Sequence, residues 1–394
     1  MMGAVLLITG SCIGAGMLAL PITTGISGFF PALCTFLLAW AFMLINAFLM
    51  LEISSSFSTQ VNIISMAGRE LGQMGRSLSW TLYLFLFYAL SVAYISGSGS
   101  LSASMAQGFL VFSIPDWMGS LFFAILFGIV VFFGTRQVDL WNRALMLGKI
   151  LAFLGLVFLS LKHIDLTLLT RTAPESAIFS LPILIIAFGF HNMIPSITHY
   201  LHGDIKEVKR AIIWGSLLAL GIYLIWEVIV LGIVPLSGPS GISESLKEGK
   251  EASQALAGIL GSSWIAGFAQ VFAFFAILTS FLAQTLALVH FLSDGLKIKG
   301  SASKEPLSLC LAALIPPLIV SLMYPQIFFK ALNFAGGICA NVLFGLLPAV
   351  IVWIGRKRKI QSSYYVKGGT PLLLGIVAFS LIILSMQLRR MMGF

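Results

Sequence analysis

The sequence predicts an all-α polytopic membrane protein with about 11 transmembrane helices, two of them broken. Hydrophobic residues make up 59% of the 394, and charged residues make up only 9%, whereas charged residues are about a quarter of a typical soluble chain. Apolar stretches of about 20 residues, long enough to cross the hydrocarbon of a bilayer, recur along the whole chain. Glycines and polar residues interrupt two of these stretches near their middle, which indicates the broken helices.

Each predicted helix is an apolar run bounded by polar or turn-forming residues, with limits given to within about two to four residues. The first five helices are expected at about 3–27, 29–57, 79–107, 117–134 and 142–161. The others are expected at about 177–200, 211–235, 262–292, 307–324, 327–354 and 371–388. The polar stretch from Glu244 to Glu251 is expected to be a soluble loop. The first run lacks a basic n-region and a cleavage site, so a helix is expected there and not a signal peptide.

The distribution of positive charge predicts the orientation of the chain. The net charge is +9, but the lysines and arginines lie mainly in short loops between apolar runs, which disfavours a nucleic-acid partner. Of these 23 residues, 15 lie in every second loop, including Lys297, Lys299 and Lys304 between helices eight and nine. This bias predicts a cytoplasmic N-terminus and a C-terminus on the opposite side.

The order of the helices predicts two halves of opposite topology in a single domain spanning 1–394. Helices one to five form repeat one, at about 3–162, and helices six to ten form repeat two, at about 177–355; the helix at about 371–388 is an addition. The broken helices, one and six, then occupy equivalent positions. A lipid-exposed break would leave backbone groups unpaired at a cost of several kcal/mol each, so breaks are tolerated where they line a cavity. This five-plus-five inverted repeat is typical of secondary transporters.

Six short motifs carry a resemblance to a known family. They are IGAGMLALP at 13–21, YISGSGSL at 94–101, VDLWNR at 138–143, FGFH with IPSI at 188–197, TSFL at 279–282 and VKGGTP at 366–371. In this order the chain resembles the aromatic amino acid permeases, and most closely the tyrosine-specific transport proteins, of the amino acid–polyamine–organocation superfamily. The resemblance implies alternating access and proton-driven import of an aromatic amino acid across the bacterial inner membrane.

The first break, at Gly10, Gly14 and Gly16, is interpreted as a substrate-binding segment. In this interpretation the N–H groups of Gly14, Ala15 and Gly16 point the positive end of the outer half-helix at the substrate carboxylate. The carbonyls that end the inner half-helix face the substrate ammonium group, with Ser11 nearby. The alternative is a helix-packing face of small residues, which this glycine spacing also favours.

The second break, from Phe188 to His191, is the other candidate part of the site. Phe188 or Phe190 is expected to stack on an aromatic ring, Gly189 to open the backbone, and His191 to pair with a phenol hydroxyl. The alternative for His191 is a buried histidine that is hydrogen-bonded to a helix carbonyl.

Two tyrosines of helix three, Tyr88 and Tyr94, bracket the SGSGS stretch of 96–100. Helix three lines the site in relatives, so one of the two is expected to contact substrate. Tyrosines that only fill space between helices are the alternative.

Lys149 and Glu52 are the candidates for coupling transport to protons. In some proton-coupled relatives of the family, a helix-five lysine takes the place that a sodium ion occupies in others, between helices one, five and eight. Lys149 matches that position, and the alternative is that its stem snorkels back to the interface. Glu52, at the end of helix two, has bracing of helix one as its alternative role. Thr279 and Ser280 keep sodium coupling open as a rival.

Other function classes are disfavoured by what the sequence lacks. No charged ring or repeated carbonyl filter suggests a channel, and no metal cluster or nucleophile with a base suggests an enzyme. The four cysteines lie singly and predict packing, so no metal or other cofactor is expected. The expected partners are an aromatic amino acid and membrane lipid, with no obligatory protein partner. The sequence leaves open whether tyrosine, tryptophan or another amino acid is preferred.

Overall fold

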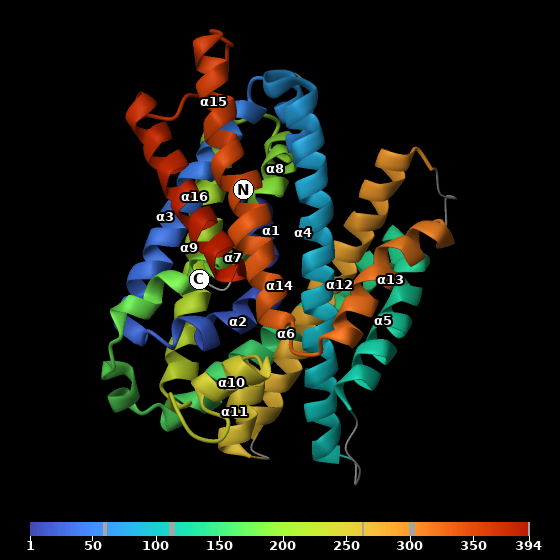
Figure 1. The fold of residues 1–394 in the computed structure, drawn as a ribbon, viewed down its shortest axis with the longest axis vertical. Coiled ribbons are helices and arrows are strands. Elements are labelled where there is room, and N and C mark those ends of the chain that lie inside the picture. The colour runs from blue at the N-terminus through green and yellow to red at the C-terminus, as the bar shows by residue number, and fades with distance from the viewer. Residues whose placement is uncertain (58–60, 110–114, 262–263, 299–303, 393–394) are drawn as a thin grey trace.

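The computed structural model describes residues 1–57, 61–109, 115–261, 264–298 and 304–392, and in these residues helices are the regular structure and no strand occurs (Figure 1). Ser262, the expected start of the eighth helix, and Lys299 lie outside the described residues. The first half consists of α1 (Met2–Cys12), α2 (Ala15–Thr24), α3 (Phe29–Ser54), α4 (Ile63–Phe109), α5 (Asp116–Phe132) and α6 (Thr135–Ser160).

The second half follows two short 3-10 helices, η1 (Leu161–His163) and η2 (Leu166–Thr170). Its broken span comprises η3 (Pro174–Ser180), α7 (Leu181–Ala187), η4 (Phe190–Met193) and α8 (Ile194–Tyr200). The remaining elements are α9 (Ile205–Leu231), α10 (Ile242–Glu248), α11 (Ala252–Leu260), α12 (Trp264–Leu296), α13 (Leu307–Met323), α14 (Phe328–Phe334), the π-helical η5 (Ala335–Leu346), α15 (Leu347–Lys357) and α16 (Gly369–Met392).

The eleven expected spans all correspond to helices in the structure. In the described residues, 8 helices are long and apolar enough to span a membrane, α1 and α2 form a further span bent by 56°, and α5 and α13 are shorter apolar helices. Many large apolar side chains of the outer helices are exposed, such as Ile150, Leu154 and Phe158 on α6. Exposed apolar surface of this extent requires lipid, so the chain is an integral membrane protein.

Two sequence expectations about the connections are wrong. The helix expected to begin near residue 79 begins at Ile63, and Gly72, at φ 67°, bends it. The expected soluble loop of 244–251 instead forms most of α10 and the N-cap of α11, and both helices pack against α2. These helices lie at the lower end of the molecule in Figure 1, away from the connection between α15 and α16. The apolar faces of α10 and α11 are short, so the charged residues between them dominated the sequence pattern and predicted a loop.

The N-terminus of α11 is closed by a buried capping box. The carboxylate of Glu251 accepts hydrogen bonds from the backbone N–H groups of Ser253 and Gln254, and the Gln254 side chain accepts from the backbone N–H of Glu251. This reciprocal pairing satisfies donors that the first turn of a helix leaves free. Burial raises the pKa of the Glu251 carboxyl to about 7.

The stability of α11 should therefore depend on pH. A carboxyl whose pKa is raised on folding stabilises the folded state below its unfolded value of 4.5 and loses that contribution as pH rises through about 7. Amide exchange of α11, corrected for intrinsic rates, should speed up by at most about tenfold per pH unit across that window, since one proton is linked. Glu251→Gln should flatten this dependence. An unchanged pH dependence in that variant would assign the effect to another group.

Candidate functional site

A cavity of about 470 Å³ lies where the two broken spans meet. Its walls come from α1 before its break, the middle of α4, the first half of α6, the later part of α12 and the break of the sixth span. The residues used below that line it are Ser11, Ile13, Phe87, Leu90, Tyr94, Asn142, Lys149, Gly189, Thr279, Ser280, Ala283 and Gln284. This volume falls within the range of about 300–1,000 Å³ that small-molecule sites occupy.

The two breaks are held together by one hydroxyl. The Tyr223 side chain on α9 reaches the carbonyl oxygen of Cys12 at 2.6 Å and that of Ala187 at 2.7 Å, which are the last residues of α1 and α7. A Cβ on Gly16 would lie 3.4 Å from the Ala187 Cα. The half-helices of the two breaks therefore pack in direct contact, as expected for breaks that face a common site.

The backbone of the first break differs from the expectation at one donor. The Gly14 N–H donates to the Cys12 carbonyl at 3.0 Å, so it is not free. In the part of the chain that the structure describes, no side chain caps the N-terminus of α2, which begins at Ala15. Ser11 is among the described residues that line the cavity, whereas Gly14, Ala15 and Gly16 are not. The expected anion-binding end of α2 thus reduces to the N–H groups of Ala15 and Gly16.

Gly14 is required for space and not for backbone conformation. Its φ of −142° and ψ of −159° are open to other residues. A Cβ at this position would lie 2.4 Å from the Ser280 Oγ on α12. The side chain of Tyr94 on α4 also hydrogen-bonds with Ser280. Tyr94 and Ser280 line the cavity, so Gly14 packs directly behind this part of its wall.

Lys149 extends from α6 to the first break. Its Nζ donates to the Ile13 carbonyl at 2.8 Å and lies 3.4 Å from the Thr279 Oγ1 on α12, and the residue is 2% exposed. The side chain therefore joins the first break to α6 and α12, the predicted helices five and eight. It does not turn back to the interface, which excludes the snorkelling alternative in this conformation. The ammonium group occupies the carbonyl-lined end of α1 that was expected to face a substrate ammonium.

The aromatic residues of the second break lie away from the cavity. Phe188 packs edge-on against Tyr223, with ring centroids 5.1 Å apart, and Phe190 stacks on His191 at 5.0 Å. The His191 Nε2 lies 2.9 Å from the Met43 carbonyl on α3. This geometry matches the alternative of a buried histidine bonded to a helix carbonyl. Of this segment's expected site residues, Gly189 lines the cavity.

The two candidate tyrosines of α4 have different surroundings. The Tyr88 hydroxyl donates to the Ala312 carbonyl on α13 at 2.8 Å, so it joins two helices outside the cavity. Tyr94 lines the cavity and is 8% exposed. The structure therefore favours Tyr94 as the tyrosine that faces a ligand.

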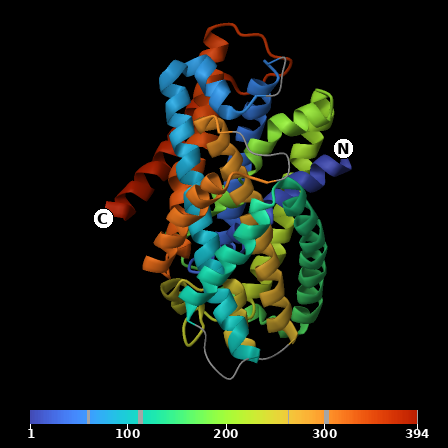
Figure 2. The same cartoon turned by 90° about the vertical axis from the view of Figure 1, so that its right-hand side faces the viewer.

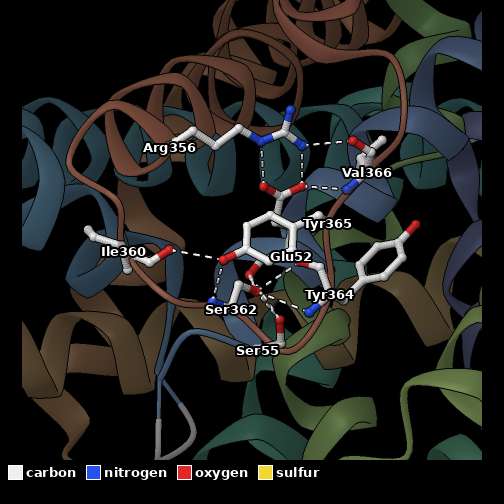
Figure 3. Close-up of polar contacts among 8 residues, drawn as sticks. All are labelled: Glu52, Ser55, Arg356, Ile360, Ser362, Tyr364, Tyr365 and Val366. Carbon is white, nitrogen blue, oxygen red and sulfur yellow. Dashed lines mark hydrogen bonds and ion pairs between the residues drawn. The ribbon is translucent and has the colours of Figure 1, made fainter.

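Glu52 lies in a polar cluster that joins the end of α3 to the segment after α15 (Figure 3). Its two carboxylate oxygens accept from the Nε and a terminal nitrogen of Arg356 at 2.7 and 2.6 Å, and one also accepts from the Val366 N–H at 2.7 Å. The Ser362 hydroxyl donates to the Glu52 carbonyl at 2.8 Å. The geometry assigns Glu52 a bracing role, although the element it braces is α15 and not helix one.

Removal of Arg356 should destabilise the protein by about 3 kcal/mol, because the Glu52 carboxylate, 5% exposed, would lose its cation. The lower thermal stability should be measurable in detergent for Arg356→Ala. The matched control is Lys367→Ala, which removes an exposed charge from the same segment and should change stability by less than about 0.5 kcal/mol. Equal effects of the two variants would contradict a role for the ion pair.

Three polar residues of this region were missed by sequence reasoning. The Gln284 Nε2 and the Asn142 Oδ1 are buried at the cavity without a hydrogen-bond partner in the described residues. Buried groups of this kind are costly unless a ligand or water pairs with them. Gln284 follows Ser280 by one helical turn, which was the available signal. The sequence gives no such signal for Tyr223, because a tyrosine within an apolar run usually packs between helices.

A polytopic helical fold with a cavity at two broken spans defines an integral membrane permease. The chain belongs to the tryptophan/tyrosine permease family, whose model matches residues 1–387. The family resemblance expected from the motifs is thereby confirmed, and the protein is a transporter and not an enzyme.

Three relatives are similar over nearly the whole chain. Tyrosine-specific transport system 1 of Haemophilus influenzae is 33% identical, over 97% of this chain and 95% of that protein. Tyrosine-specific transport system 2 of the same organism is 31% identical, over 95% and 94%. A tryptophan-specific transport protein of Shigella flexneri is 29% identical, over 96% and 92%.

Proposed function

We propose that this protein imports an aromatic amino acid, most consistently tyrosine, by proton symport with alternating access across the bacterial inner membrane. The observation that carries the proposal is the position of the Lys149 ammonium, held between the break of α1 and α12 at the inner wall of a ligand-sized cavity. The names of the relatives support the substrate class, because two are tyrosine-specific and one is tryptophan-specific.

The conformation supports an inward-facing state. The cavity is lined by α1 before its break, by the N-terminal half of α6 and by the later part of α12. These parts adjoin the loops that carry most of the positive charge, which the charge rule places in the cytoplasm. On the other side, the α2 residues Ala15 and Met17 to Ile22 are buried. An alternating-access cycle requires a state in which the central cavity is open toward the cytoplasm and closed on the opposite side, and these observations support that state.

The inverted repeat has support from the position of the breaks. The first span breaks at Ile13–Gly14 and the sixth at Phe188–Gly189, and the two breaks touch through Gly16 and Tyr223. Spans one and six begin their respective halves. Two broken helices that meet at one site are the arrangement typical of a five-plus-five fold.

The cavity suggests how an aromatic amino acid would lie. Its carboxylate would lie at the wall that Ser280 forms, beside the uncapped N-terminus of α2, where the helix dipole favours an anion. Its ring would pack against the apolar walls formed by Phe87, Leu90 and Ala283. The unpaired Gln284 Nε2 would then donate to a phenol hydroxyl. This role replaces the one expected for His191, whose ring nitrogen is bonded to Met43.

Gln284→Leu should weaken tyrosine uptake more than phenylalanine uptake, because phenylalanine offers no hydroxyl to pair. One lost hydrogen bond of about 1.4 kcal/mol corresponds to a roughly tenfold rise in KM for tyrosine alone. The measurement is competition of both amino acids against labelled tyrosine in liposomes. His191→Leu is the comparison variant and should affect both substrates equally. An equal loss for both substrates in Gln284→Leu would remove it from hydroxyl recognition.

Purified protein in liposomes tests the transport class. Saturable uptake against a tyrosine gradient fits a secondary transporter, whereas a channel only equilibrates the two sides. The coupling ion has a rival, because the Thr279 and Ser280 hydroxyls near Lys149 are oxygen ligands of the kind that sodium prefers. The 2.8 Å contact of the Lys149 Nζ with the Ile13 carbonyl favours the proton, since a cationic side chain already fills that position.

A further inference from the structure

A second cavity, of about 570 Å³, lies at the C-terminal ends of α2 and α16, whereas the first lies beside α1 and the N-terminal half of α6. Its walls include the end of α2, η3, α10, α14 and the last turns of α16. Figure 2 shows the C-terminal end of α16, marked C, diverging from the bundle. α16 is the additional helix that follows the two proposed repeats, and its last turns form part of the cavity wall.

The chemistry of this cavity is that of a site for a zwitterion. Arg389 and Arg390 supply two guanidinium groups, and among the described residues that line the cavity none is acidic. Asn333 is 6% exposed, its Nδ2 donates to the Phe329 carbonyl at 2.8 Å, and its Oδ1 has no partner in the described residues. The arginines can bind a carboxylate, and the buried amide oxygen can accept from an ammonium group.

The rest of the wall is suited to an apolar side chain. Phe179 and Met386 line the cavity, and Thr23 contributes from α2. A cavity of this volume with a few convergent polar groups in an apolar wall is the usual form of a small-molecule site. Because Thr23 lies on the half-helix whose other end adjoins the central cavity, an occupant would contact an element that alternating access must move.

We infer that this cavity, the outer vestibule, is a second binding site that docks an amino acid with an apolar or aromatic side chain before it enters the central site. The inference deepens the proposed function and rests on it for the direction of transport. In the outer vestibule, Arg389 and Arg390 bind the carboxylate and the Asn333 Oδ1 accepts from the ammonium group. α16 thereby supplies the charge that concentrates substrate at the outer entrance.

Equilibrium binding of labelled tyrosine to protein in phosphatidylcholine nanodiscs tests the outer vestibule. The wild type should bind about two molecules per chain, and Arg389→Ala/Arg390→Ala should bind one fewer. Asn333→Leu should weaken the same site. Lys162→Ala/Lys330→Ala removes two exposed charges of the same face, outside the vestibule, and should bind as the wild type does.

Gly14→Leu separates this inference from the proposed function, because it blocks the central site alone. It should retain the binding that the arginine variant loses. A wild type that binds one molecule, lost in Gly14→Leu and kept in the arginine variant, would overturn the vestibule and leave the central site intact. If the wild type binds one molecule and only the arginine variant loses it, the central site is overturned and the outer vestibule is kept.

Lipid phosphate is the other anion that arginines at a helix end can bind, and lipid composition distinguishes it. The loss in Arg389→Ala/Arg390→Ala should be the same in pure phosphatidylcholine and with added phosphatidylglycerol. A second tyrosine that binds only when anionic lipid is absent, or a loss that occurs only when it is present, would assign the arginines to lipid and overturn the inference.

Discussion

Replacing Gly14 with leucine should abolish tyrosine uptake, by at least about 100-fold, while the protein still inserts in the membrane. The side chain would have to occupy space 2.4 Å from the Ser280 Oγ, where the break of helix one touches α12. A distortion of about 1 Å at a positioned site suffices for a loss of this size. Uptake is measured per amount of inserted protein. The matched control is Gly221→Leu on α9, where a Cβ meets nothing within 4 Å.

A paired substitution tests the contact itself. Gly14→Ala should lower uptake because its Cβ clashes with the Ser280 hydroxyl oxygen, whereas the Ser280 Cβ lies at an acceptable 3.5 Å. Ser280→Ala removes only the oxygen, so the double variant should transport as well as Ser280→Ala alone. Additive losses in the double variant would contradict a role for this contact.

Lys149→Ala should remove proton-driven accumulation of tyrosine altogether. The Nζ that joins the Ile13 carbonyl to Thr279 would be gone, and with it the group proposed to bind and release the coupled proton. The unpaired Ile13 carbonyl costs about 1–3 kcal/mol, so folding should be checked by thermal stability in detergent. Exchange of internal for external tyrosine needs no net proton movement and should persist.

The matched control for this variant is Lys162→Ala, which removes an exposed lysine just beyond α6. It should concentrate tyrosine as the wild type does. Unaltered proton-driven uptake by Lys149→Ala would overturn the assignment of Lys149, and loss of exchange together with accumulation would assign it a structural role.

The spans and their breaks could be predicted because membrane helices are defined by local composition. Glycines at 10, 14 and 16 weaken a helix wherever they occur, and the apolar length sets the span. The short amphipathic helices of the 242–260 segment escaped, since their stability comes from packing on α2 and from the Glu251 cap. The charged residues of this segment do not indicate that its helices pack on α2.

The direction of side chains at the breaks could not be predicted from sequence. A broken helix has no period, so nothing in the order of Phe188 to His191 says that these rings face α3 and α9. The position of the Lys149 side chain could be predicted, because a regular helix and the family resemblance placed it opposite the first break. Gln284 and Tyr223 became visible only when tertiary contacts showed which polar atoms lack partners and which bridge the two breaks.

The most direct test of proton-coupled import is uptake by wild-type protein in sodium-free liposomes with an imposed pH gradient, acidic outside. The account predicts that labelled tyrosine accumulates above its external concentration and that a protonophore releases it. Accumulation that requires sodium and ignores the pH gradient would contradict the account, as would simple equilibration of tyrosine across the membrane.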